Sequence, residues 1–293
     1  MSELNKLPER LNKRPDCVYK YLCANRAISI LDRLLIRFSQ PSVLNDALEF
    51  KPQLEGLGTR TDVERFMRKM LPLKMPELIG QINAANSPER ADQIISSIVS
   101  QGADWMESQP GRYDNSVKDL YARLDRDYGV LSLSETPASA LMWSHYASGG
   151  FGFLIEFNAQ HSWFWDKRAP RDSFNHLRQV SYHDRTPAYF LNLPDDIALY
   201  TKTPDWSYET EWRIIRRLSE AAGKEGPDGY GKDVLLFAIP PDAINSVVIG
   251  YRSTAESVKE LKEVANANAE LSHVMFKKAI LRDNGSIDVQ PAF

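Results

Sequence analysis

The pattern of apolar and polar positions divides the chain into three stretches, the first of which reads as strand, helix, strand. Residues 18–22 and 34–39 are short runs of aliphatic and aromatic side chains, which favour strands. Between them, residues 25–33 carry apolar side chains at helical spacing. Asn25 is a suitable N-cap for that helix. We therefore expect a strand–helix–strand unit near the N-terminus.

A long helical segment follows, from about residue 61 to residue 126. Apolar residues recur there at i, i+3 and i+4, and Pro88 stands at the first position of a helix that Ser87 opens. Its stripe of Met and Leu side chains is typical of a packed core, which is far commoner than a cofactor site with that composition. The segment is therefore predicted to be a helical insertion, 61–126, without chemistry of its own.

After Asp127 the chain changes to strand patterns interrupted by one amphipathic helix at 254–265. The predicted strands cover residues 129–133, 151–157, 180–182, 209–216, 234–239, 246–250, 274–281 and 286–289. Strands combined with a helical insertion, without regular β–α alternation, predict an α+β fold. Residues 1–17 read as a loose polar tail, so we expect a single α+β domain over residues 18–293.

Composition narrows the class of protein. With 293 residues, 43% of them hydrophobic and 26% charged, the chain is typical of a globular protein, and its net charge of -3 gives no global signature of nucleic-acid binding. The two cysteines, Cys17 and Cys23, are too few for a disulfide framework or a zinc site and fit a reducing compartment. No apolar run approaches the ~18 residues of a membrane span. We expect a cytoplasmic protein with no membrane partner and no resident metal.

The strongest candidate for chemistry is the segment 208–213. If it is a strand, its side chains alternate, so that Glu209, Glu211 and Arg213 share one face with about 7 Å between neighbours. A solvated charged face is the commoner explanation of such alternation. The flanking tryptophans, Trp206 and Trp212, favour a polar cleft instead, because strands this aromatic rarely lie fully in water. Glu209 and Glu211 are therefore candidate catalytic acids.

A second candidate segment, residues 141–147, precedes a glycine-rich turn. It places Trp143, His145 and Tyr146 within four positions. An imidazole can act as a general base or hydrogen-bond a ligand. The alternative is a short helix whose His and Tyr make structural hydrogen bonds to the sheet. No serine or cysteine nucleophile motif accompanies it, so His145 is a candidate catalytic residue and Tyr146 a candidate ligand contact.

A third group lies on the two N-terminal strands. Tyr19, Lys20 and Tyr21, together with Ser39 and the Asn45-Asp46 pair, form one wall of a site if these strands lie beside the glutamate strand. The chain has no P-loop, no G-x-G-x-x-G motif and no H-E-x-x-H motif, and its five histidines show no metal-ligand spacing.

The order of these motifs resembles a large family of bacterial proteins of unknown function. The resemblance runs from about residue 18 to residue 250, around a variable middle that corresponds to the helical insertion. The motifs are, in order, Tyr-Lys-Tyr at 19–21, Phe-Ser-x-Pro-x-x-x-Asn-Asp at 38–46, Leu-Ser-x-Ser-Glu at 131–135, Met-Trp-Ser-His-Tyr-Ala at 142–147, and Lys-x-x-x-Trp-x-Tyr-Glu-x-Glu-Trp-Arg at 202–213.

The layout also resembles the ADP-ribosyltransferase superfamily more distantly. That superfamily has an early strand with a polar side chain, a helix, a second strand bearing Ser or Tyr, and a late strand with the catalytic Glu. Here Glu211 is followed by a strand, the Pro240-Pro241 turn and a further strand at 244–248, and Glu209-Thr210-Glu211 matches the Glu-x-Glu form. The resemblance implies a mixed or antiparallel sheet core with a helical insertion.

The same resemblance implies an enzyme that uses NAD as substrate and Glu211 as its catalytic carboxylate. Cleavage of the nicotinamide–ribose bond passes through an oxocarbenium-like state, which an ionised carboxylate stabilises, and Arg213 favours ionisation of Glu211. Where the superfamily usually has His or Arg on its first strand, this chain has Lys20 and Tyr21. The expected nucleotide contacts are Tyr19, Lys20, Tyr21, Ser39, Tyr146 and Arg213.

The biological role implied is that of a toxin or anti-phage defence effector, with a nucleic acid or a protein as acceptor. Two other functions stay open. One is a metal-dependent nuclease with Asp46, Glu209 and Glu211 as ligands and Lys20 or Lys202 nearby, since carboxylates with a lysine suit magnesium-assisted hydrolysis. The other is a non-catalytic nucleotide-sensing or partner-binding module.

Overall fold

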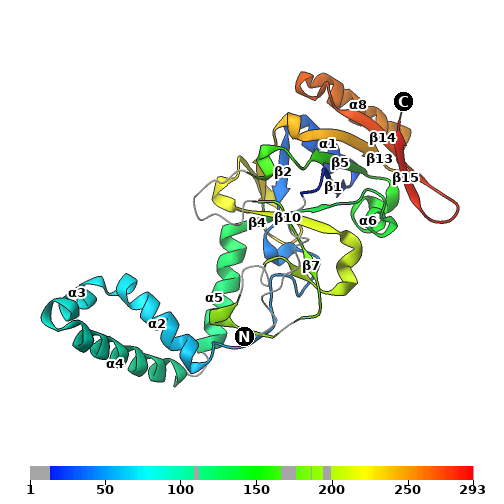
Figure 1. Ribbon diagram of the computed structural model, residues 1–293. Coiled ribbons are helices and arrows are strands. Elements are labelled where there is room, and N and C mark those ends of the chain that lie inside the picture. Colours follow the sequence, from blue (N-terminus) through cyan, green and yellow to red (C-terminus); the bar gives the residue numbers. More distant parts are fainter. Residues whose placement is uncertain (1–13, 109–111, 166–175, 186, 194–198, 293) are drawn as a thin grey trace. The chain divides into compact units, whose positions relative to one another are not determined.

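The computed structural model describes residues 14–108, 112–165, 176–185, 187–193 and 199–292, and Figure 1 labels many of its helices and strands. Contacts divide the chain into two compact units. We call residues 1–47, 125–184 and 200–293 the sheet unit, and residues 48–124 and 185–199 the helical unit. No helix of the described residues is long and apolar enough to cross a membrane.

The main sheet of the sheet unit has eight strands in the order β15-β14-β13-β5-β1-β4-β10-β6. β13 and β14 are parallel and the other neighbours are antiparallel, so the sheet is mixed. The predicted α+β class with a mixed sheet is confirmed. The strands are β1 (Cys17–Leu22), β4 (Tyr128–Ser134), β5 (Phe153–Asn158), β6 (Arg178–Gln179), β10 (Glu211–Arg217), β13 (Ile244–Ile249), β14 (Met275–Leu281) and β15 (Ile287–Pro291).

A second, three-stranded sheet in this unit has the order β11-β12-β2 and is antiparallel throughout. Its strands are β2 (Leu35–Phe38), β11 (Gly223–Pro227) and β12 (Asp233–Ala238). Two short strands, β7 (Ser181–Tyr182) and β9 (Thr201–Lys202), pair in parallel elsewhere in the unit. The short 3-10 helices of the unit are η3 (Pro41–Val43), η4 (Ser148–Gly150), η5 (Ser162–Phe164), η7 (Pro204–Glu209), η8 (Leu218–Glu220), η9 (Pro241–Ala243) and η10 (Ala269–Leu271).

Both faces of β1 are covered. Val18 and Leu22 belong to one apolar core, together with buried residues of helix α1 (Ala24–Arg33), and helix α8 (Ala255–Ala267) contributes to the same core. Tyr21 belongs to a second core, together with the fully buried Trp143 of helix α6 (Ala140–Tyr146). Alternation along β1 therefore turns Lys20 toward the same face as Val18 and Leu22. Cys23 is the N-cap of α1, so the prediction of Asn25 was wrong.

β10 pairs with β4 along one edge, and on the other edge β4 meets different partners at its two ends. These partners position the candidate site. β1 and β4 share the pair Tyr19 and Ser134. Farther along β4, Val130 pairs with Ser39, which directly follows β2 of the second sheet. Between these contacts the ammonium of Lys20 donates a hydrogen bond to the carbonyl oxygen of Ser132, at 2.8 Å. The side chain of Lys20 therefore occupies the place where β1 and β4 cease to pair.

The helical unit is built from α2 (Arg60–Lys74), α3 (Pro76–Ala85), α4 (Pro88–Glu107) and the part of α5 (Arg112–Asp127) up to residue 124, with a 3-10 turn, η6 (Phe190–Asn192). Thr59 and Asp62 form a capping box that starts α2. Ser87 caps α4, where Pro88 takes the first position. Strand β3 (Leu54–Gly56) pairs in parallel with β8 (Ala188–Tyr189) in the same unit.

Candidate functional site

The backbone between residues 204 and 211 sets the geometry of the two candidate acids. η7 ends at Glu209, and Thr210 adopts left-handed dihedrals, with φ 41° and ψ 51°. β10 begins only at Glu211. The prediction of a continuous strand from Glu209 was therefore wrong, because a left-handed residue interrupts the extended chain. Strand alternation does not relate the two acids, and another contact must bring their carboxylates together.

That contact is Lys202 at the end of β9. Its ammonium lies 2.5 Å from Oε2 of Glu209 and 2.8 Å from Oε2 of Glu211. On the other side, Arg213 binds both oxygens of Glu211, with Nε at 2.9 Å and a terminal nitrogen at 2.7 Å. All four side chains are at most 5% exposed. We call Lys202, Glu209, Glu211 and Arg213 the carboxylate cluster.

Tyrosine and serine hydroxyl groups fix the cluster in place. The Tyr146 hydroxyl, from α6, donates to Oε1 of Glu209 at 2.5 Å and accepts from the side-chain amide of Asn45. The backbone N–H of Glu211 donates to the Tyr182 hydroxyl oxygen at 2.7 Å. Ser134 Oγ donates to the carbonyl oxygen of Glu209, also at 2.7 Å. Each carboxylate is therefore held through both its side chain and its backbone.

The cluster keeps Glu211 ionised at physiological pH. Burial alone would raise the pKa of Glu211, but the charges of Arg213 and Lys202 outweigh it and hold the pKa at about 2. Burial and the neighbouring carboxylate of Glu209 raise the pKa of Tyr146. Glu211 can thus stabilise a developing positive charge, and at neutral pH it has no proton to donate.

The carboxylate cluster does not suit a divalent cation. Ammonium and guanidinium groups occupy the carboxylate oxygens that a metal would need. Within the described residues, no group of three or more His, Cys, Asp or Glu side chains is arranged to hold a metal ion. The geometry of Glu209 and Glu211 gives no support to the metal-dependent nuclease.

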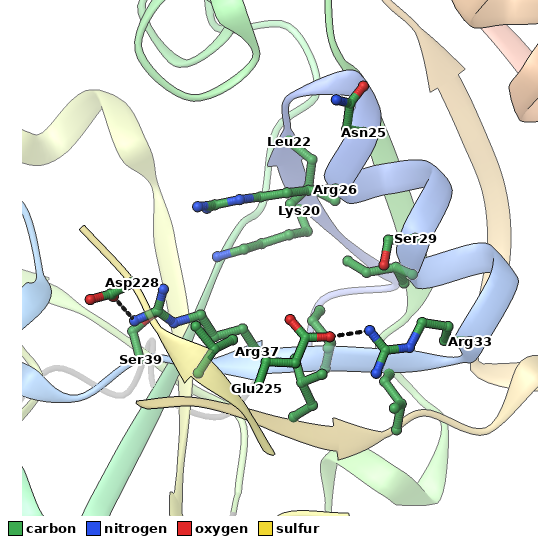
Figure 2. A pocket seen from close by; sticks show the side chains of 15 residues that line it. Lys20, Leu22, Asn25, Arg26, Ser29, Arg33, Arg37, Ser39, Glu225 and Asp228 are labelled. Atoms are coloured by element: carbon green, nitrogen blue, oxygen red, sulfur yellow. Dashed lines mark hydrogen bonds and ion pairs between the residues drawn. The ribbon is translucent and has the colours of Figure 1, made fainter. Parts of the chain in front are cut away.

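A cavity of about 310 Å³ lies in the same unit, lined by β1, α1, β2, β12 and the residues around β11 (Figure 2). Two predicted nucleotide contacts, Lys20 and Ser39, line it. The lining contains four cationic and two acidic side chains, and we call this cavity the arginine pocket. Its charged residues are Lys20, Arg26, Arg33, Arg37, Glu225 and Asp228.

Ion pairs join the two sides of the arginine pocket. Arg37 contacts Oδ2 of Asp228 at 2.5 Å, and Arg33 contacts Glu225 (Figure 2). Figure 2 also shows the side chains of Lys20 and Arg26 pointing in the same direction. Burial lowers the pKa of Lys20 to about 8; Glu211 opposes this shift and Arg26 adds to it. Lys20 is therefore electrostatically coupled both to the pocket and to the carboxylate cluster.

One family model matches part of the chain. Residues 142–214 match the family described as "Protein of unknown function (DUF2971)". No curated protein and no solved structure matches the chain. The match supports similarity to a family of unknown function and carries no activity. The match begins within α6 and ends within β10, and so includes Tyr146 and the whole carboxylate cluster.

The other predicted site residues lie apart from the arginine pocket. Tyr21 is buried, and its hydroxyl donates to the carbonyl oxygen of Thr136 at 2.8 Å. Tyr19 lines a different cavity, and burial followed by the charge of Glu156 raises its pKa. His145 is exposed on α6 and stacks on Tyr208, with 6.0 Å between ring centroids. The described residues that line these two cavities do not include Glu211, Tyr21 or His145.

The structure adds residues that the sequence reasoning did not assign to a site. The sequence placed Lys202 at the start of the 202–213 motif and near a candidate metal site, and in the structure its ammonium bridges the two acids. Arg37 lies two residues before Ser39, so strand alternation places both on one face, a signal that was present in the sequence. Arg26 had no comparable signal, because an exposed arginine on a helix is ordinary.

Proposed function

We propose that this protein binds NAD, or a closely related nucleotide, in the arginine pocket and is an ADP-ribosyltransferase-like enzyme. The observation that carries the proposal is that Lys20 of β1 and Ser39 after β2, two residues expected to contact the nucleotide, line one cavity. Its volume of about 310 Å³ is at the lower end of small-ligand sites, which span about 300–1,000 Å³. It suits part of a dinucleotide, with the remainder extending into solvent.

The order of elements supports the same proposal. A first strand with a polar side chain, a helix and a second strand followed by Ser39 are all represented among the elements that line the pocket. A late strand, β10, begins with the ionised Glu211. This is the order that the ADP-ribosyltransferase superfamily uses. The resemblance is one of layout, so the reaction must be tested directly.

In this proposal Glu211 stabilises the oxocarbenium-like state that forms when the nicotinamide–ribose bond breaks. Arg213 holds both of its oxygens, and Lys202 holds Oε2 as well. Glu211 does not line the arginine pocket, so the proposal requires the nucleotide to extend beyond the pocket and a ribose hydroxyl to replace Lys202 at Oε2. Glu209 also binds Lys202, at 2.5 Å, so the displaced ammonium keeps a partner. The role of Glu209 is thus to hold Lys202 when the substrate binds.

The complete pairing of Glu211 favours a second candidate function, a non-catalytic nucleotide-sensing module. Two cations already balance the charges of Glu209 and Glu211, and a neutralised carboxylate stabilises a positive transition state less well. In this alternative the arginine pocket binds the same nucleotide, the carboxylate cluster serves only the fold, and no turnover occurs.

The test measures NAD binding by calorimetry and nicotinamide release by chromatography, for the wild type and Glu211→Gln. We expect the variant, measured well below pH 8 so that Lys20 stays protonated, to bind NAD normally and to release nicotinamide about 10²–10³-fold more slowly. The matched control is Glu156→Gln, since Glu156 is a buried glutamate of the same sheet that is also paired with a lysine, Lys277, at 2.5 Å. This control should release nicotinamide at the wild-type rate even if its free energy of unfolding is lower.

Each outcome separates the candidates. Binding of NAD by the wild type without nicotinamide release would favour the sensing module. Absence of both binding and release would refute both functions. Where turnover is found, labelled NAD incubated with nucleic acid or with a protein extract identifies the acceptor class. Growth arrest of a bacterial host that expresses the wild type, but not Glu211→Gln, would support a toxin or defence role.

A further inference from the structure

The hairpin of β11 and β12 carries acidic side chains to the arginines of the arginine pocket. Glu225, on β11, contacts Arg33 of α1. Asp228, in the turn that follows β11, contacts Arg37 of β2 at 2.5 Å. All four side chains line the pocket (Figure 2). The cations therefore have internal anionic partners on one side of the cavity.

The cations nevertheless exceed the anions. Four cationic side chains against two carboxylates leave a formal charge of +2 on the lining. Arg26 is exposed and makes no ion pair with any described residue. Lys20 donates to a backbone carbonyl, which does not neutralise its charge. An excess of this sign attracts a doubly charged anion such as a terminal phosphate.

Arg37 has hydrogen-bonding capacity to spare. One terminal nitrogen binds Asp228, whereas its buried Nε has no hydrogen-bond partner among the described residues. A buried donor without a partner costs free energy, so a ligand oxygen that displaces Asp228 and reaches Nε gains affinity. The planar guanidinium fits the oxygens of a phosphate with two parallel hydrogen bonds. Asp228 therefore accepts one hydrogen bond from a guanidinium that can donate two parallel hydrogen bonds to a phosphate.

We propose that Lys20, Arg26 and Arg37 form a phosphate subsite, and that the carboxylate of Asp228 occupies the phosphate's place beside Arg37 when the pocket is empty. The inference rests on the proposed nucleotide pocket and adds the ligand group that the pocket recognises. Asp228 then competes with the ligand and sets the affinity. Glu225 competes with the ligand more weakly, because the side chains of its pair with Arg33 are 41% and 46% exposed.

The position of Asp228 makes it a suitable residue for an isosteric test. Its Oδ1 accepts from the backbone N–H groups of Tyr230 at 2.9 Å and Lys232 at 3.1 Å, which shapes the turn. Its Oδ2 faces Arg37, whose guanidinium holds the pKa of Asp228 below the ordinary value. Asparagine keeps the oxygen that shapes the turn and replaces the oxygen that faces Arg37. Asp228→Asn therefore removes the competing charge and the acceptor that faces Arg37, while keeping the turn.

The experiment measures dissociation constants of ADP, adenosine and inorganic pyrophosphate by calorimetry at fixed salt. Asp228→Asn should bind ADP about 5–10-fold more tightly than the wild type, as loss of one competing ion pair implies. Adenosine, which lacks phosphate, should bind both proteins equally. Tighter binding of pyrophosphate than of ADP would assign the subsite to free phosphates and not to a nucleotide.

The matched control is Asp233→Asn, which removes the same charge from the same hairpin. Asp233 pairs with Lys224 at 2.8 Å and does not line the arginine pocket. Its ADP affinity should stay within about twofold of the wild type, as expected for a charge outside the site. Equal gains in both variants would mean that net charge alone is responsible, and would overturn the proposal.

The remaining outcomes separate this inference from the function on which it rests. If the wild type binds ADP and Asp228→Asn binds it equally or more weakly, Asp228 merely positions Arg37 and only the subsite inference fails. If neither protein binds any of the three probes, the nucleotide pocket itself is refuted. Should Asp228→Asn not fold, Glu225→Gln serves instead, with an expected gain of about twofold.

Discussion

Replacing Lys202 with methionine tests whether the carboxylate cluster is held by ion pairing. Methionine keeps the aliphatic stem of the lysine and removes the ammonium that contacts both Glu209 and Glu211. The variant leaves two buried carboxylates beside one guanidinium, that of Arg213. Removing one partner of a buried ion pair costs about 3–5 kcal/mol. Against the 5–15 kcal/mol that ordinarily separates folded from unfolded protein, this is a large fraction.

The assay is urea denaturation followed by tryptophan fluorescence, at pH 7 and at pH 4. The control is Lys224→Met, which removes an exposed lysine paired with Asp233 at 2.8 Å. A surface pair contributes about 0–1 kcal/mol, so the two variants should differ in their free energy of unfolding by at least about 2 kcal/mol at pH 7. A loss below 1 kcal/mol for Lys202→Met would refute the reasoning.

The pH dependence gives the same prediction a second readout. In the wild type, the folded-state pKa of Glu211 is about 2, below its unfolded value. Its contribution to stability is therefore complete above pH ~4.3 and is lost as the pH falls through about 2. In Lys202→Met the cluster can take up a proton on acidification, which removes the uncompensated charge. The stability difference between wild type and variant should thus shrink from pH 7 to pH 4.

Two further predictions concern the pocket and the sheet. Because burial lowers the pKa of Lys20 to about 8, its ammonium is present below that pH, so ADP should bind progressively more weakly as the pH rises through 8, and Lys20→Met should abolish this dependence in calorimetric titrations. A constant affinity from pH 6.5 to 9 would contradict the role of Lys20. Gly152→Ala places a Cβ 2.0 Å from the carbonyl oxygen of Leu22, so we expect a loss of at least about 2 kcal/mol in urea denaturation. The control is Gly229→Ala, where a Cβ meets nothing within 4 Å and the stability should change by under 1 kcal/mol.

The sequence pattern predicted well those elements whose own side chains define them. The run 234–239 predicts β12, observed at Asp233–Ala238, and the run 274–281 predicts β14, observed at Met275–Leu281. These strands are long enough for their apolar residues to indicate an extended chain without reference to a partner. Helical spacing likewise predicted α8, where Leu261 and Ala265 are buried on one face.

Elements that depend on tertiary pairing could not be found in this way. β9 has only two residues, and it exists because it pairs with β7, which the pattern at 180–182 did indicate. Nothing in the sequence predicts the left-handed backbone of Thr210, since threonine has no preference for that conformation. Its consequence was large, because it separates Glu209 from β10. Alternation on one strand related the two acids in the sequence, whereas in the structure Lys202 brings their carboxylates together.

The contacts of the candidate site also differ in whether the sequence alone could predict them. Glu211 and Arg213 lie two positions apart on one strand, so alternation predicts that their side chains lie on one face, and they bind each other through two hydrogen bonds. Lys202 comes from β9 and Tyr146 from α6, and only the fold brings them to Glu209. Short-range contacts could be predicted from the chain, whereas contacts between elements required the structure.

Lys20 links the arginine pocket to the carboxylate cluster. Its ammonium lines the arginine pocket, and Glu211 is the charge that most favours its protonated form. A phosphate bound in the pocket would favour that form further, which raises the pKa of Lys20. The charge of Glu211 and the charge of a bound phosphate therefore act on the same ammonium. It follows that Glu211→Gln should lower the pH at which ADP binding weakens, even where Glu211 itself touches no ligand.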